Sequence, residues 1–303
     1  MTAHVAERGE GRGRVVLRLT GTQAANEQAI RAAIHVAQAF HSEIESLFVY
    51  DRQIADAAGY GFVREIAAPA IVRFSSAAVA REASEGRGID VAGIQRQLEL
   101  IGRHVQRRVG ELAALADVPV HMRFVSDTPL RALSEACQVA GPWNVVALAE
   151  PFTAESLSRL ETLFERVTGM TGVVLVGPRA AAPDRGSAVV AVIEDPERVT
   201  GMLRTAERLA GASRSDVVLA VAAASRAAQS WLRTEVAHAM EDRPAVPIVE
   251  LGRAGGGAGV IAEALRQLRP GFVIAEHGGL VVPREGDFRP LGVALGCPLL
   301  VVR

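Results

Sequence analysis

Short apolar runs alternate along the chain with longer segments in which apolar residues recur at helical spacing. The runs cover residues 15–22, 44–50, 118–125, 143–149, 172–177, 189–196, 216–222, 245–251, 271–276 and 297–302. Between the first two runs, Ile30, Ala33 and Ala37 mark one face of a helix. Strands that alternate with helices need crossover connections, so the pattern predicts an α/β fold with mostly parallel strands.

The series of runs occurs twice in the same order. Val15 and Val189 open the two series, and Val118 and Val246 are equivalent positions in the third run of each. The first pair is separated by a longer stretch of chain than the second, so the first series contains an insertion between its second and third runs. Internal duplication of one α/β unit is the simplest cause of such a repeat.

The repeat predicts two domains, one spanning 13–180 with an inserted segment 51–90 and one spanning 187–303. We expect their boundary near Pro183, in a stretch rich in proline and glycine. Each domain is predicted to be an open, mostly parallel five-stranded sheet with helices on both faces, in a Rossmann-like, pseudo-two-fold tandem. A single sheet through both halves would contradict this organisation. The inserted segment is expected to form a lid or interface element before a helix from about Val91 to Leu115.

Composition and charge argue against two classes of partner, nucleic acids and membranes. The 303 residues carry a formal net charge of −1 and a pI of about 6.7, so no bulk positive field would attract nucleic acid. No apolar run approaches the roughly 20 residues that a membrane-spanning helix needs. The segment 1–12 is polar where a signal peptide would be apolar. We therefore expect a cytoplasmic protein with no nucleic-acid or membrane partner.

The sequence lacks the common catalytic and metal-binding motifs. All 33 basic side chains are arginine, which excludes Schiff-base chemistry and the Walker A loop, since both require a lysine. The seven histidines are scattered and lack the spacing of a zinc site. Cys137 and Cys297 lie in apolar segments and are expected in the core. We predict no catalytic residue, no metal and no enzymatic activity.

Ligands of open parallel sheets bind beyond the carboxyl ends of the strands, so the turns at those ends contain the candidate site residues. In the second domain, Glu194 and Asp195 lie at the end of the first run, and His277, Gly278 and Gly279 follow the fourth. Acidic and glycine-rich turns on strands of one sheet are the first place to look for a ligand.

The glycine-rich turn after the third run of the second series is an alternative site. It contains Gly257-x-Gly259-x-x-Ala262, and Glu276 ends the next apolar run, at a spacing that suits an acidic contact to a ribose. A dinucleotide site normally uses the first strand-to-helix turn, however, and a flexible loop would contain such glycines as well. The alternative remains a nucleotide-dependent protein or enzyme that uses the unit from Gly257 to Glu276.

The C-terminal segments resemble those of a known family. Residues 273–279 (VIAEHGG) and 291–303 (LGVALGCPLLVVR) resemble the closing segment of universal stress protein domains of the UspA type, and 15–22 (VVLRLTGT) resembles their opening strand. The resemblance covers both repeats, so the chain is similar to a tandem universal stress protein. It implies one five-stranded parallel sheet per domain and two domains packed as an internal pseudo-dimer.

In nucleotide-binding members of that family, an Asp ends the first strand and a Gly-x2-Gly-x9-Gly-Ser/Thr motif follows the fourth. The first domain has Thr20 at the Asp position and Phe152 at a motif glycine, so the resemblance implies no ATP there. In the second domain it assigns cofactor binding to residues that could contact ATP or AMP, namely Glu194, Asp195, His277, Gly278, Gly279 and Gly292. The motif is incomplete here too, because Val293 replaces the hydroxyl residue.

From these features we expect a non-catalytic, tandem universal-stress-protein-like module that acts in stress response or regulation. Its nucleotide site is degenerate in the first domain and doubtful in the second, so we expect no resident cofactor. The two domains form an internal pseudo-dimer with an unidentified protein partner, and a homodimer of the whole chain is left open.

Overall fold

The computed structural model describes residues 13–19, 23–50, 91–138, 143–149, 160–177, 180–181, 186–251, 257–284 and 289–303. The inserted segment 51–90, Thr20, Phe152 and the predicted boundary at Pro183 lie outside these ranges. We refer to the described residues up to 181 as the first half and to those from 186 onwards as the second half.

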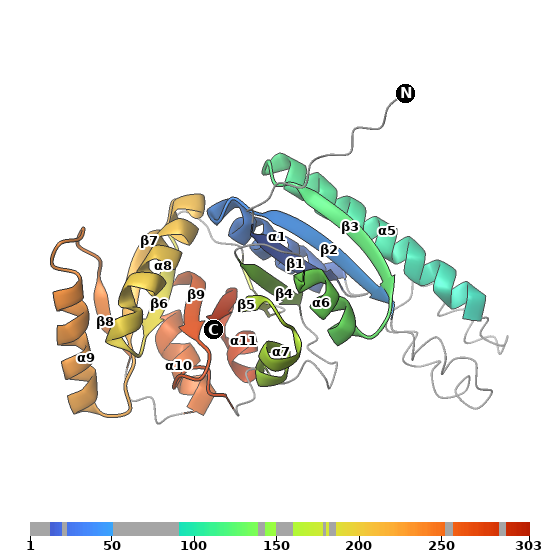
Figure 1. Ribbon diagram of the computed structural model, residues 1–303. Coiled ribbons are helices and arrows are strands. Elements are labelled where there is room, and N and C mark those ends of the chain that lie inside the picture. The colour runs from blue at the N-terminus through green and yellow to red at the C-terminus, as the bar shows by residue number, and fades with distance from the viewer. Residues whose placement is uncertain are drawn as a thin grey trace.

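Strands and helices alternate through both halves, as the apolar pattern predicts (Figure 1). The first half contains β1 (Arg14–Leu19), α1 (Gln23–Ala39), β2 (Glu43–Tyr50), α5 (Val91–Leu115), β3 (Val120–Ser126), α6 (Pro129–Cys137), β4 (Asn144–Ala149), α7 (Leu160–Arg166) and β5 (Met170–Val176). The second half contains β6 (Ala188–Ile193), the 3-10 helix η2 (Pro196–Arg198), α8 (Val199–Ser213), β7 (Asp216–Val221), α9 (Arg226–Ala239), β8 (Ile248–Glu250), α10 (Gly257–Arg266), β9 (Pro270–Glu276), α11 (Arg289–Leu295) and β10 (Leu299–Val302). Every predicted run forms a strand, and the predicted long helix is α5.

The strands form one sheet in the order β3-β2-β1-β4-β5-β10-β9-β6-β7-β8. All neighbouring strands are parallel except β5 and β10, which are antiparallel from Leu299 opposite Leu175 to Val302 opposite Gly172. The expectation of two separate five-stranded sheets is therefore wrong, because the last strands of the two halves pair with each other. This pairing satisfies backbone groups that would otherwise line two exposed sheet edges.

Each half has the same internal strand order. From its free edge inward, the first half follows β3-β2-β1-β4-β5 and the second half follows β8-β7-β6-β9-β10. Internal duplication remains our interpretation of this order. In each half the chain adds strands on one side of its first strand and then on the other, which leaves a crevice at the carboxyl ends of β1 and β4, and of β6 and β9.

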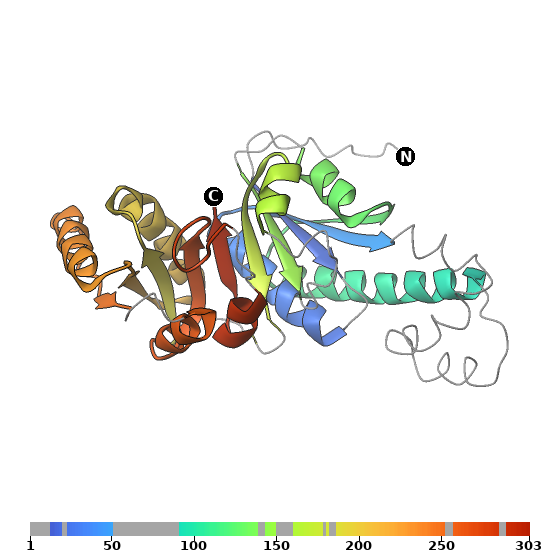
Figure 2. The ribbon, with the colours of Figure 1, turned by 90° about the horizontal axis from the view of Figure 1, so that it is seen from below.

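Helices cover both faces of the sheet. α1, α5, α8 and α9 pack on one face, and α6, α7, α10 and α11 pack on the other. Figure 2 shows α5 and α6 on opposite sides of the first-half strands. Along β1, Val15 and Leu17 belong to one core and Val16 to the other, which is the alternation expected of a strand. None of the described helices is both long and apolar enough to cross a membrane.

The two halves share their cores instead of closing separate ones. The core on the α1 face includes Leu17 from the first half and Phe272 from the second, both fully buried. α1 packs directly against α8, and the Arg208 guanidinium of α8 lies 5.6 Å from the centre of the Phe40 ring at the end of α1. The contact between the halves is therefore a hydrophobic interface as well as a strand pairing.

Candidate ligand-binding site

The crevice of the second half lies at the carboxyl ends of β6 and β9, which are neighbours in the sheet. Glu194 directly follows β6, and the turn His277-Gly278-Gly279 directly follows β9. Asp195 is the next residue after Glu194, so five of the six residues that the sequence assigns to the site lie at these two neighbouring strand ends. Its position is the one at which ligands bind in open parallel sheets.

Glu194 closes this crevice from inside the protein. Its Oε2 accepts a hydrogen bond from the backbone N–H of Leu280, and its Oε1 accepts one from Val281 at 3.2 Å. Burial raises the pKa of Glu194, the two backbone hydrogen bonds act against this rise, and the nearby Glu276 adds to it. The carboxylate therefore already occupies the donors that an external anion would need.

Gly279 allows this close approach. A Cβ atom built on Gly279 would lie 2.5 Å from Oε2 and 2.7 Å from Oε1 of Glu194. A methyl group at this position cannot coexist with the observed carboxylate. The glycine predicted to admit phosphate instead admits the side chain of Glu194.

The side chain of Asp195 caps a short helix. Its side chain accepts a hydrogen bond of 2.9 Å from the backbone N–H of Glu197 and caps the short helix η2, which begins at Pro196. Its backbone is extended, with φ of −133°, as is usual for a capping residue. Helix capping therefore explains the presence of an aspartate at position 195.

The His277 ring turns away from Glu194 towards the first half. Its centre lies 4.7 Å from that of Phe164 on α7, with the planes inclined by 40°. The backbone N–H of His277 donates to the Val302 carbonyl of β10 at 2.8 Å, which fixes the start of the turn. Burial and, next, the positive charge of Arg284 lower the pKa of His277. The histidine therefore belongs to the contact between the halves more than to the crevice.

The two remaining glycines differ in their surroundings. Gly278 has a φ of +93° and donates its N–H to the Val282 carbonyl at 2.8 Å, so its conformation requires a glycine. A Cβ atom there would also approach Nε of Arg284 to 2.9 Å. Gly292 is buried within α11, in a helix and not in the glycine turn. Among the described contacts, none connects Gly292 with Glu194 or His277.

The alternative dinucleotide unit is not assembled in the way that its spacing suggests. The Gly257 turn follows β8 and Glu276 ends β9, and β7 and β6 lie between these two strands. Neighbouring strands are about 4.8 Å apart, so the two strand ends are separated by roughly 14 Å across the sheet. The Glu276 carboxylate also forms an ion pair of 3.2 Å with Nε of Arg198.

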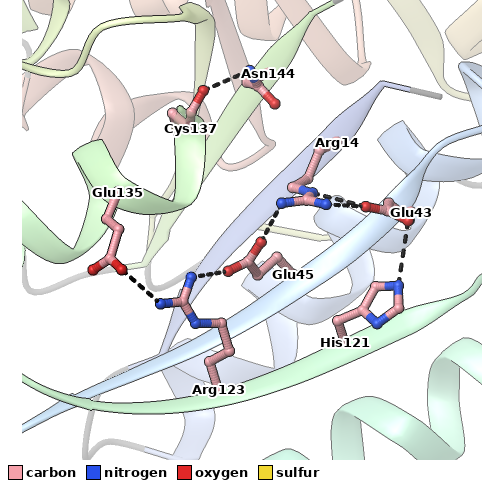
Figure 3. A network of polar contacts seen from close by, with 8 residues as sticks. All are labelled: Arg14, Glu43, Glu45, His121, Arg123, Glu135, Cys137 and Asn144. Atoms are coloured by element: carbon pink, nitrogen blue, oxygen red, sulfur yellow. Dashed lines mark hydrogen bonds and ion pairs between the residues drawn. The ribbon is translucent and has the colours of Figure 1, made fainter. Parts of the chain in front are cut away.

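Sequence reasoning missed a charged network at the other end of the first-half strands (Figure 3). Its centre is Glu45 on β2, whose side chain is 4% exposed and pairs with Arg14 of β1 at 2.6 Å and with Arg123 of β3 at 2.8 Å. Arg14 also binds Glu43, which lies 3.3 Å from the exposed His121. The hydrogen bond to Glu45 is the main cause that raises the pKa of Arg123. The alternation Glu43-x-Glu45 and His121-x-Arg123 was the available signal.

An uncharged side chain, Asn144, lies at the start of the neighbouring strand β4. Nδ2 of the buried Asn144 donates to the carbonyls of Cys137 at 3.0 Å and Gly169 at 3.2 Å, and so ties the end of α6 to the turn before β5. Both cysteines are free and buried, as expected, and burial raises the pKa of each thiol to about 12. Within the described ranges, no three His, Cys, Asp or Glu residues are grouped as a metal would need.

Comparison with known proteins identifies the fold. No protein-family model matches the sequence. No curated protein matches it either. A universal stress protein from Archaeoglobus fulgidus has a similar structure, with a TM-score of 0.55 and 13% identity over 96% of both chains. The fold is universal-stress-protein-like.

Three further structures share this architecture. A functionally unknown protein and a putative universal stress protein, both from Pseudomonas aeruginosa, match with TM-scores of 0.54 and 0.50, each at 13% identity over 96% of this chain and 92% of theirs. The cytoplasmic domain of a prokaryotic cation chloride cotransporter matches with a TM-score of 0.50 and 10% identity, over 96% of this chain and 95% of that one. At these identities the likeness concerns the fold alone.

Proposed function

We propose that this protein is a non-catalytic, universal-stress-protein-like module of stress response or regulation, with the two halves acting as an internal pseudo-dimer. The observation that carries the proposal is the contact of Glu194 with the backbone N–H groups of Leu280 and Val281. Backbone N–H groups in a glycine turn are the usual donors to a phosphate. Here they are taken by a carboxylate of the same chain.

A nucleotide could bind to this turn only by displacing Glu194. Two like charges cannot share the same donors in a partly buried site, and the displaced carboxylate would lie beside the incoming phosphate. The neighbouring acids are also engaged, because Asp195 caps η2 and Glu276 pairs with Arg198. We therefore propose that neither ATP nor AMP is a resident cofactor, and that the turn is a closed, structural element.

Calorimetry on the full chain with ATP, AMP and NAD tests this proposal. The wild-type protein should bind none of them measurably at millimolar concentration, because each would have to displace Glu194. Glu194→Gln is the informative variant, because it removes the charge of the side chain that fills the turn. Asp195→Asn removes the charge of the adjacent residue and is the matched control. Tight ATP binding by the wild type, weakened by Gly279→Ala, would overturn the proposal. Binding of NAD that Gly257→Val abolishes would favour the dinucleotide alternative instead.

The fold neighbours support a regulatory role without specifying a partner. The same architecture occurs in a universal stress protein, in a putative universal stress protein and in the cytoplasmic domain of a cation chloride cotransporter, so one fold is found in proteins of different kinds. We propose a cytoplasmic location and an unidentified protein partner. Light scattering on the full chain tests whether a homodimer forms in addition to the internal pairing. If the chain is a monomer, the pairing of its two halves through β5 and β10 is the whole assembly. A stable dimer would add an interface between two chains.

A further inference from the structure

Two histidines lie on opposite faces of the sheet where the halves meet, and each packs on a phenylalanine of the other half. His35 of α1 lies 5.7 Å from Phe272 of β9, measured between ring centres. His277 of the second half lies 4.7 Å from Phe164 of α7. We refer to the contact formed by β5, β10 and the helices α1, α7 and α8 as the seam. The seam thus contains one histidine from each half.

His35 has no partner for a second proton. The residue is 8% exposed, it hydrogen-bonds the backbone of Leu209 on α8, and its Nε2 is buried without a hydrogen-bond partner. On α8, the flanking Glu207 and Arg208 are exposed, and Arg208 lies over the Phe40 ring. Among the described residues, no charged group shifts the pKa of His35. Burial lowers this pKa to about 4, against the effect of the Leu209 hydrogen bond.

The surroundings of His277 also disfavour its protonated form. Its Nε2 is buried and lacks a hydrogen-bond partner. The charged groups that act on the ring are Arg284 from the following turn, Arg303 from the end of β10 and Glu161 from α7. Burial and the two arginines lower the pKa of His277, and only Glu161 acts in the opposite direction. A proton on this ring would place a third positive charge beside the arginines.

We propose that the seam is a pH-sensitive joint, in which protonation of His35 and His277 loosens the contact between the two halves while each half keeps its own strands. The closed seam accommodates two neutral imidazoles, because each Nε2 is buried without a hydrogen-bond partner that could accept a hydrogen bond from a second proton. The open seam exposes both rings to water, where they accept protons. Closing is therefore linked to proton release.

The sign and size of the effect follow from His35. The pKa of His35 is about 4 in the closed seam and 6.5 when the ring is open to water. The closed seam is therefore fully stable above pH 6.5, and it loses stability relative to the open seam as the pH falls towards 4. At pH 5 the closed-to-open ratio should be about 30-fold lower than at pH 7.5 from His35 alone, by proton linkage. His277 acts in the same direction. The proposal does not depend on whether a nucleotide binds.

Hydrogen exchange followed by mass spectrometry on the full chain tests the proposal at pH 7.5 and pH 5.0, after correction for the intrinsic exchange rate. Peptides covering β5 and β10 should lose protection by about 30-fold or more at pH 5, whereas peptides covering β1 and β7 should keep theirs. His35→Asn supplies an amide N–H for Leu209 but cannot titrate, and combined with His277→Phe it should remove the pH effect. His238→Gln, an exposed histidine on α9, is the matched control.

Three results would overturn the proposal. One is the same loss of seam protection in the double variant as in the wild type. Another is simultaneous loss in all four strands, which would indicate global unfolding. The third comes from the wild-type protein and needs no variant to fold. In an NMR series the imidazole signals of His35 should titrate with a pKa of about 4 and those of His277 with a pKa below the ordinary value of 6.5, and titration of both at the ordinary value would contradict a closed, neutral seam.

Discussion

The two halves share one scaffold but differ in what fills the amino ends of their outer strands. In the first half, Arg14, Glu45 and Arg123 form a charged network across β1, β2 and β3. By the strand registers, the second half has Ala188, Val218 and Val249 at the corresponding places on β6, β7 and β8. The same strand order therefore tolerates either ion pairs or aliphatic packing at this end.

This comparison shows that the network is not a requirement of the fold. A buried ion pair gains Coulomb energy but loses hydration, so replacement by apolar residues is often neutral. Removal of a single partner is different, because it leaves a buried charge without compensation. The difference between the halves can thus be tested by removing one charge or by exchanging all of them.

The largest expected effect is that of Glu45→Ala. The side chain of Glu45 is 4% exposed and pairs with both Arg14 and Arg123. Its loss leaves Arg14 with Glu43 alone and Arg123 with the exposed Glu135, so the free energy of unfolding should fall by about 2–3 kcal/mol in urea titrations. Glu135→Ala is the matched control, because this carboxylate also contacts Arg123 but is 58% exposed, and its loss should cost less than about 1 kcal/mol.

Exchange of the network for the residues of the second half sharpens this prediction. The triple variant Arg14→Ala, Glu45→Val and Arg123→Val removes the buried carboxylate together with both arginines that pair with it. It leaves Glu43 beside the exposed His121 and leaves the exposed Glu135 in solvent, and it should be more stable than Glu45→Ala. A triple variant as unstable as the single one would show that the first half depends on its charges. The two halves would then differ in more than the choice of side chains.

The strands were predictable from the sequence because each is a short apolar run between helical segments. The ends of the strands were less predictable. The predicted run 245–251 is a strand only at Ile248–Glu250, because Pro247 lacks a backbone N–H for the sheet. The pairing of β5 with β10 could not be predicted. Both strands are apolar in sequence, and this pattern is the same whether the sheet ends at such a strand or continues beyond it.

The position of the candidate site was predictable from the sequence, whereas the contact that fills it was not. The turns after β6 and β9 are adjacent, as strand-end reasoning expects, yet no sequence pattern showed that Glu194 would bind the glycine turn 86 positions away. Glu45 was missed for a related reason. Alternating charges on a strand normally indicate a solvent-facing side, and only the tertiary fold buries Glu45 beside α6.

A smaller effect is expected from Gly279→Ala. The added methyl group would overlap Oε2 of Glu194 and displace its carboxylate from the Leu280 and Val281 amides, which should cost about 1–2 kcal/mol in thermal or urea unfolding. The loss should be smaller in a Glu194→Ala background, because the clash is then absent. Gly201→Ala on α8, which has open space around its Cβ position, should be neutral or stabilising. Equal losses in both backgrounds would mean that Gly279 does not act through Glu194.

The smallest expected effect is that of His121→Ala, at the exposed end of the first-half network. Nε2 of His121 lies 3.3 Å from Glu43, but the histidine side chain is 61% exposed, so solvent screens the pair. Its loss should change the free energy of unfolding by less than about 0.5 kcal/mol. Urea titrations beside Glu45→Ala make the contrast direct, because both residues lie on the same face of neighbouring strands. If His121→Ala approached the cost of Glu45→Ala, the network would act as one unit, and burial of Glu45 would not be what distinguishes the two halves.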